Sequence, residues 1–215
     1  MHRWFNWFGQ PGTFVLTVLL SCTALVLALA FPAPQRWLCL CGMLASTAGD
    51  LVNTDWRGIG RKLPCPILYA GAGCFAAAHG FYIAALAGLI RSSGAELVNP
   101  GFFAAAAVIL TAGVLVSAVC FCRDGFRWLA QRGNRLTYGV CLAYLCVIGC
   151  MLAAAFSLAW STRGPHLLTA VGAFSFFISD LFIGLGVLCG VRSRFVIGGV
   201  WWFYPIGQLL LIAFV

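Results

Sequence analysis

Two aspartates stand inside stretches of the sequence that are otherwise apolar, and they are the first residues to consider for chemistry. Asp180 lies near the middle of the run AFSFFISDLFIGLG, and Asp50 lies about one helical turn before the end of another apolar run. His79 is the only histidine deep within such a run. Because an ionised carboxylate in hydrocarbon is costly, these acids must be protonated, paired or in contact with water. We therefore expect Asp50, Asp180 and His79 to be catalytic.

Other polar and aromatic residues fall on the same helical faces as these three. Asn53 follows Asp50 at a three-residue step, and the same step leads from His79 to Tyr82. The last apolar run, at about residues 195–214, has a further helical face with polar and aromatic residues, which includes Trp201, Tyr204 and Gln208. The predicted substrate-binding residues are together Tyr82, Tyr204, Gln208, Asn53 and Trp201. For the glutamine, a hydrogen bond between helices is the simpler alternative, and for the aromatic residues of the last run it is packing.

The chain that carries these residues has the composition of a polytopic membrane protein. Of its 215 residues, 62% are hydrophobic and 8% are charged. Several apolar runs of about 20 residues are long enough to cross about 30 Å of hydrocarbon, and prolines and glycines separate them. We predict an all-α transmembrane helical bundle, one transmembrane domain over residues 1–215, with seven helices at about 12–30, 36–54, 66–90, 101–122, 136–160, 167–189 and 195–214.

The basic residues are distributed unevenly over the connections between these helices. Ten of the 13 lysines and arginines fall on one side of the predicted bundle, and Arg36, Arg91 and Arg163 fall on the other. By the positive-inside rule the amino terminus is cytoplasmic and the carboxyl terminus is outside, in a multi-pass protein of a bacterial-type inner (plasma) membrane. Because the arginines lie in membrane loops and not in one stripe, the net charge of +8 does not indicate nucleic-acid binding.

The sequence also contains 11 cysteines, which could be disulfide partners or metal ligands. Nearly all of them fall within apolar helical runs. The pairs Cys39/Cys41 and Cys120/Cys122 have a two-residue spacing, which directs the side chains to different helix faces. We predict that the cysteines are small buried hydrophobic residues.

Four short motifs resemble, in order, those of the YhhN-like membrane proteins, the lysoplasmalogenase family. They are Ala48-Gly49-Asp50, Ala78-His79-Gly80-Phe81-Tyr82, Phe177-Ile178-Ser179-Asp180 and Tyr204-Pro205-Ile206-Gly207-Gln208. The resemblance extends from about Pro11 to the carboxyl end, and it implies hydrolysis of the vinyl-ether bond of lysoplasmalogens to a fatty aldehyde and glycerophosphoethanolamine or glycerophosphocholine. The chain departs from the family in two respects. The family commonly has eight helices, and Gln10-Pro11 stands where a Lys-Pro often opens a helix.

The candidate catalytic residues suit this reaction. Vinyl-ether hydrolysis needs a neutral acid that protonates a carbon atom, and a negative group that stabilises the resulting oxocarbenium ion or activates water, as in glycoside hydrolysis. Two nearby buried carboxyl groups can supply the neutral acid and the negative group, because repulsion between two carboxylates opposes the ionisation of both at once. We expect Asp50 and Asp180 to share these roles, in an order that the sequence leaves open. His79 and Tyr204 would orient water or a substrate hydroxyl.

Two other functions remain open from the sequence. The same residues could serve a transporter or binding protein for lipids or small amphiphiles, or Asp50, His79 and Asp180 could be ligands in a metal-dependent lipid hydrolase. No metal-binding motif accompanies them, so we expect neither a metal nor another cofactor. The expected partners are a lysophospholipid substrate and the lipid bilayer. The sequence leaves the oligomeric state and the lipid headgroup open.

Overall fold

The computed structural model describes residues 9–124, 132–191 and 193–215, and this part of the chain contains helices and no strand. The long helices are α1 (Gly9–Ala30), α2 (Pro34–Asn53), α3 (Ile67–Ser93), α4 (Pro100–Asp124), α5 (Arg132–Thr162), α6 (His166–Leu188) and α7 (Arg194–Phe214). Two short 3-10 helices, η1 (Trp56–Gly58) and η2 (Gly60–Lys62), connect α2 to α3. The all-α prediction is confirmed, and the observed helix ends differ from the predicted ones by a few residues.

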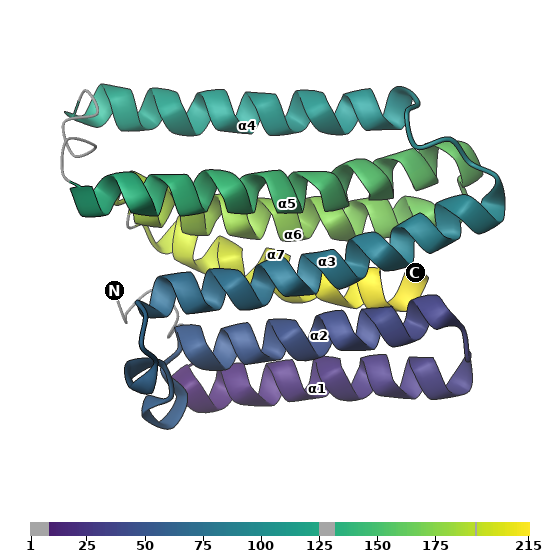
Figure 1. Ribbon diagram of the computed structural model, residues 1–215, viewed down its shortest axis with the longest axis horizontal. Coiled ribbons are helices and arrows are strands. Elements are labelled where there is room, and N and C mark those ends of the chain that lie inside the picture. The colour runs from purple at the N-terminus through teal and green to yellow at the C-terminus, as the bar shows by residue number, and fades with distance from the viewer. Residues whose placement is uncertain (1–8, 125–131, 192) are drawn as a thin grey trace.

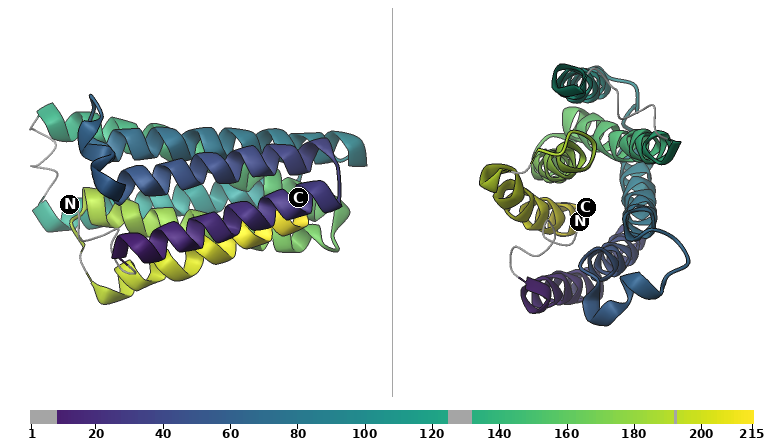
Figure 2. Two further views of the ribbon diagram at one scale, coloured as in Figure 1. Left: turned by 90° about the horizontal axis from the view of Figure 1, so that it is seen from below. Right: turned by 90° about the vertical axis from the view of Figure 1, so that its left-hand side faces the viewer.

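Successive long helices run in opposite directions, as Figure 1 shows. Six of them form a closed ring in which each helix contacts its two neighbours, in the order α1, α2, α3, α5, α6, α7 and back to α1; the ring is visible end-on in Figure 2. α4 lies outside this ring, against α5 and α6. The carboxyl ends of α2, α4 and α6 and the amino ends of α3, α5 and α7 share one end of the bundle, which we call the basic end because Arg57, Arg61 and Lys62 lie there.

Six α-helices of the described chain are long and apolar enough to cross a membrane, namely α1, α3, α4, α5, α6 and α7. α2 has 20 residues and lies alongside α1 and α3, but it is too polar for this set. Its polar residues Ser46, Asp50 and Asn53 are buried inside the bundle. The protein is therefore a multi-pass membrane protein, and residues that face the interior contribute to the low hydropathy of α2.

Glycines allow close approach between the helices that carry the candidate residues. A Cβ atom at Gly207 of α7 would lie 2.7 Å from the backbone nitrogen of Phe176 in α6, so a larger residue would push the two backbones apart. At Gly49 of α2, a Cβ atom would lie 2.8 Å from the ring of Phe75 in α3. These close crossings bring α6 against α7 and α2 against α3.

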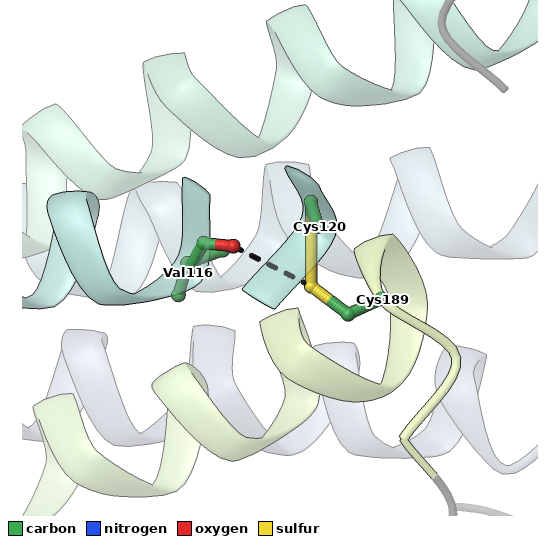
Figure 3. Close-up of a disulfide and its surroundings, with 3 residues drawn as sticks. All are labelled: Val116, Cys120 and Cys189. Carbon is green, nitrogen blue, oxygen red and sulfur yellow. Dashed lines mark hydrogen bonds between the residues drawn. A yellow bond between two sulfur atoms is a disulfide. The ribbon is translucent and has the colours of Figure 1, made fainter. Parts of the chain in front are cut away.

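The prediction that the cysteines are small buried hydrophobic residues is wrong for most of them. Cys120 of α4 and Cys189, just after α6, form a disulfide at the basic end, and Cys189 Sγ lies 3.7 Å from the carbonyl oxygen of Val116 (Figure 3). Among the free cysteines of the described chain, Cys39 is buried and the others are intermediate or exposed. An apolar run does not distinguish the outer surface of a membrane helix from its buried face, because lipid and protein interior are both apolar.

Candidate active site

Asp180 of α6 lies at one end of a chain of hydrogen-bonded side chains. Tyr144 of α5 donates a hydrogen bond of 2.5 Å to Asp180 Oδ2, and Tyr144 Oη lies 2.9 Å from Nε2 of His79 in α3. The other ring nitrogen of His79, Nδ1, lies 3.2 Å from Met151 Sδ. Both His79 and Met151 are fully buried. Three helices of the ring therefore meet in one polar chain that ends on a carboxyl group.

Asp50 of α2 has a tyrosine partner of its own. Tyr204 of α7 donates a hydrogen bond of 2.5 Å to Asp50 Oδ2, and both side chains are buried. The site thus contains two tyrosine–aspartate pairs, each joining two different helices.

A second polar network links the same helices one to two turns further from the basic end. Tyr82 of α3 donates a hydrogen bond of 2.6 Å to Gln208 Oε1 of α7, and Gln208 Nε2 donates one of 2.9 Å to Ser46 Oγ of α2. All three side chains are fully buried. Because the glutamine amide uses both its donor and its acceptor within the bundle, this network is suited to fixing α2, α3 and α7 relative to one another.

Aromatic rings surround the two tyrosine–aspartate pairs. The ring of Phe176 lies 4.8 Å from that of His79 and 5.4 Å from that of Tyr204, measured between centroids. Phe75 packs edge-on against both Phe176 and Tyr204. These rings place the polar groups in surroundings of low polarity, where charges and hydrogen bonds act more strongly than in water.

A cavity of about 140 Å³ lies between α3, α4, α5 and α6, and its wall includes Asp180 and Tyr144. Most of its other lining residues are apolar. Asn53, at the end of α2, also lines the cavity, and its Oδ1 atom is buried without a hydrogen-bond partner among the described residues. The cavity therefore combines an apolar wall with a carboxyl group and an asparagine, as expected for a site that binds an amphiphile.

The predicted residues thus fall into distinct places. Asp50, His79, Asp180 and Tyr204 belong to the two tyrosine–aspartate groupings, and Asn53 lines the cavity. Tyr82 and Gln208 bind each other, and neither lines the cavity. Trp201 is buried on α7 and is not part of the cavity wall either. The roles assigned to all eight residues stay predictions.

Tyr144 is the main residue that the sequence reasoning missed. It is a tyrosine in the apolar part of α5, about three turns from the basic end of that helix, a depth similar to that of Asp180 in α6. This similar depth was the feature of the sequence that could have identified Tyr144. Met151 lies about two turns further along α5, and nothing in the sequence marked it, because methionine is an ordinary core residue.

A metal site was one alternative for the same residues. In the ranges that the structure describes, no group of three or more histidine, cysteine, aspartate or glutamate side chains is arranged to hold a metal ion. Asp50, His79 and Asp180 come from three helices, and tyrosine hydroxyls occupy one oxygen of each carboxyl group. The contacts observed among these side chains are hydrogen bonds.

Comparison with models of protein families identifies the family of the chain. The model of the YhhN family matches residues 10–215, nearly the whole chain. No curated protein and no solved structure matches the chain.

Proposed function

Because the chain belongs to the YhhN family, we propose that it is a membrane-embedded hydrolase that cleaves the vinyl-ether bond of lysoplasmalogens. One observation supports this most directly: Asp180 forms part of the wall of an apolar cavity and is hydrogen-bonded to Tyr144 there. A carboxyl group beside a site for a hydrocarbon chain can act on a bond at the end of that chain. The products are a fatty aldehyde and a glycerophosphoethanolamine or glycerophosphocholine.

The cavity favours a lipid with a single hydrocarbon chain. Its volume of about 140 Å³ resembles that of apolar protein cavities that hold one benzene molecule. A short segment of one chain next to the vinyl ether fits this space, whereas two parallel chains do not. The glycerol hydroxyl of the substrate would donate a hydrogen bond to the unpaired Oδ1 atom of Asn53.

The phosphate headgroup would lie at the basic end. Arg61 is held there by Asp55, through a contact of 2.6 Å between Arg61 Nε and Asp55 Oδ2. Arg57 and Lys62 are exposed at the same end and are suited to meet a phosphate. In the orientation predicted from the basic residues, this end faces the cytoplasm of a bacterial-type inner membrane.

The reaction begins with Asp180 in its neutral form. Its proton passes to the alkene carbon that is not bonded to oxygen, and the electrons of the double bond form the new C–H bond. The adjacent carbon becomes an oxocarbenium ion, and Asp180 becomes a carboxylate. Water then adds to that carbon while the Asp180 carboxylate removes a proton from the water. The hemiacetal collapses to aldehyde and alcohol, and Asp180 is again neutral.

Asp50 fits the electrostatic role in this scheme. It does not line the cavity, but its partner Tyr204 and His79 of the Asp180 chain both lie against the ring of Phe176. The role requires Asp50 to be ionised, a form that the hydrogen bond from Tyr204 favours and burial opposes; as a carboxylate it would stabilise a cationic transition state nearby. In this proposal Asp180 takes the acid role, because it lines the cavity, and Asp50 takes the electrostatic role.

The proposal is tested by incubating the purified protein in detergent with a 1-alkenyl lysophospholipid and measuring fatty aldehyde by mass spectrometry. A 1-alkyl lysophospholipid of the same chain length is the matched substrate control, because it lacks the double bond that accepts the proton. We expect aldehyde from the alkenyl lipid alone, and unchanged release after strong chelation. If no alkenyl lysolipid is turned over, the hydrolase assignment is wrong and a lipid-binding or transport role takes its place.

A further inference from the structure

We propose that His79, Tyr144 and Asp180 form a proton relay in which Tyr144 is a positioning residue for the acid. The purpose of the relay rests on the proposed function, but the contacts from which we infer the relay do not depend on it. It assigns a role to Tyr144, and it specifies which nitrogen of His79 carries a proton.

The protonation state of His79 depends on the surroundings of its Nδ1 atom. That atom lies 3.2 Å from Met151 Sδ inside the fully buried core. A thioether sulfur has no proton and can only accept a hydrogen bond. The contact is therefore a hydrogen bond only when Nδ1 carries a proton, and an unprotonated Nδ1 would face the sulfur with two lone pairs opposed.

The Tyr144 hydroxyl carries a single proton. Tyr144 Oη has two neighbours in the chain, His79 Nε2 at 2.9 Å and Asp180 Oδ2 at 2.5 Å. One hydroxyl proton can be donated to only one of them. The other neighbour must supply a proton of its own for both contacts to be hydrogen bonds.

Two arrangements of the protons turn every contact among Met151, His79, Tyr144 and Asp180 into a hydrogen bond. In the first, His79 is doubly protonated and donates to Tyr144, which donates to the Asp180 carboxylate. In the second, Asp180 is protonated and donates to Tyr144, which donates to Nε2 of a neutral His79. Both keep the proton on Nδ1, and both are neutral overall. They interconvert when one proton crosses each of the two hydrogen bonds of Tyr144.

A third arrangement of the protons lacks one of the hydrogen bonds and carries a net negative charge. A neutral His79 that is protonated at Nε2 would leave Nδ1 without a hydrogen bond to Met151. It would also leave Asp180 as an anion with no cation among these three side chains, which is costly for a carboxyl group whose side chain is 11% exposed and surrounded by apolar residues. The geometry thus favours a relay that stores a proton on His79 and returns it to Asp180 as the neutral acid.

The direct test is ¹⁵N solid-state NMR of histidine-labelled protein in lipid bilayers. The chain has three histidines, and the signals of His79 are identified by their loss in His79→Gln. We expect a protonated Nδ1 in the wild type. A neutral His79 with its proton on Nε2 and a bare Nδ1 would overturn the relay, whether or not the protein turns over any lipid.

A second test uses Tyr144→Phe, which keeps the ring and removes the hydroxyl. With an alkenyl lysolipid, we expect kcat to fall by about tenfold or more, but by less than the roughly 10²- to 10⁴-fold expected on removal of the acid itself, with KM unchanged. Tyr69→Phe is the matched control, because Tyr69 also joins α3 to α5 through its hydroxyl, at 3.0 Å from Thr137 Oγ1, outside the cavity wall. Equal kcat values for the two variants would contradict a role of Tyr144 beyond packing.

Discussion

Tyr204 and Asp50 are separated by 154 positions in the chain, yet their side-chain oxygens lie 2.5 Å apart in the buried centre of the bundle. The contact joins α7 to α2 across the ring of helices. Tyr144 and Asp180 repeat the arrangement between α5 and α6. A carboxyl group that receives a short hydrogen bond from a tyrosine of another helix is thus the repeated element of the site.

The Tyr204–Asp50 contact predicts a stability effect. Tyr204→Phe leaves the buried carboxyl group without its donor and should lower the free energy of unfolding by about 1.5–3 kcal/mol, the range for a hydrogen bond to a charged group. Thermal unfolding in detergent measures it. In a double-mutant cycle, Asp50→Leu should cost less in the Tyr204→Phe background than in the wild type. Strictly additive costs would show that the two side chains are not coupled.

The crossing of α6 and α7 predicts the effect of an added methyl group. Gly207→Ala would place a Cβ atom 2.7 Å from a backbone nitrogen, which cannot rotate away, and should destabilise the protein by about 1–3 kcal/mol. Gly73→Ala is the control, because its Cβ atom would meet nothing within 4 Å. If both variants unfold at the wild-type temperature, α6 and α7 are not as close as described.

The cavity predicts a change in chain-length preference. Gly184 lines the cavity, and a Cβ atom there would meet no neighbour within 4 Å, so Gly184→Leu should extend into the free space. We expect the variant to keep its stability and to turn over short-chain alkenyl lysolipids better than long-chain ones. Gly80→Leu, also in open space but away from the cavity wall, should leave the preference unchanged. An unaltered preference in Gly184→Leu would place the hydrocarbon chain elsewhere.

The disulfide provides a test of membrane orientation. Cys120 and Cys189 lie at the basic end, which the positive-inside rule places in the reducing cytoplasm. We therefore expect both thiols to be alkylated when intact cells are quenched with a membrane-permeant reagent, and the bond to form on exposure to oxidant. Mass spectrometry of the two peptides measures this. An intact disulfide in quenched cells would indicate the opposite orientation.

The sequence predicted the depth of the site residues better than their partners. Asp50, His79 and Asp180 could be compared along the bundle because the rise per residue of a helix is fixed. Which helices are neighbours is not written in the chain order: α3 contacts α5 and bypasses α4, and α1 closes the ring against α7. The partnership of Tyr144 with Asp180 depends on that arrangement, so it could not be predicted.

Two further differences have a similar origin. For Gln208 the sequence allowed a substrate ligand or, more simply, a hydrogen bond between helices, and the structure gives its amide two protein partners, Tyr82 and Ser46. Cys120 looked like a core residue because its surroundings in sequence are apolar, and the structure pairs it with Cys189. In each case the sequence indicated the type of environment correctly and left the contact to tertiary packing.

The most direct test of the central claim is the fate of solvent hydrogen. When an alkenyl lysolipid is hydrolysed in D₂O, proton transfer from the exchangeable carboxyl group of Asp180 should place one deuterium on the carbon next to the aldehyde carbonyl. Mass spectrometry of the aldehyde, trapped as it forms, detects that label, and Asp180→Asn should release no labelled product. Aldehyde that forms at the wild-type rate without deuterium would contradict protonation of carbon by Asp180.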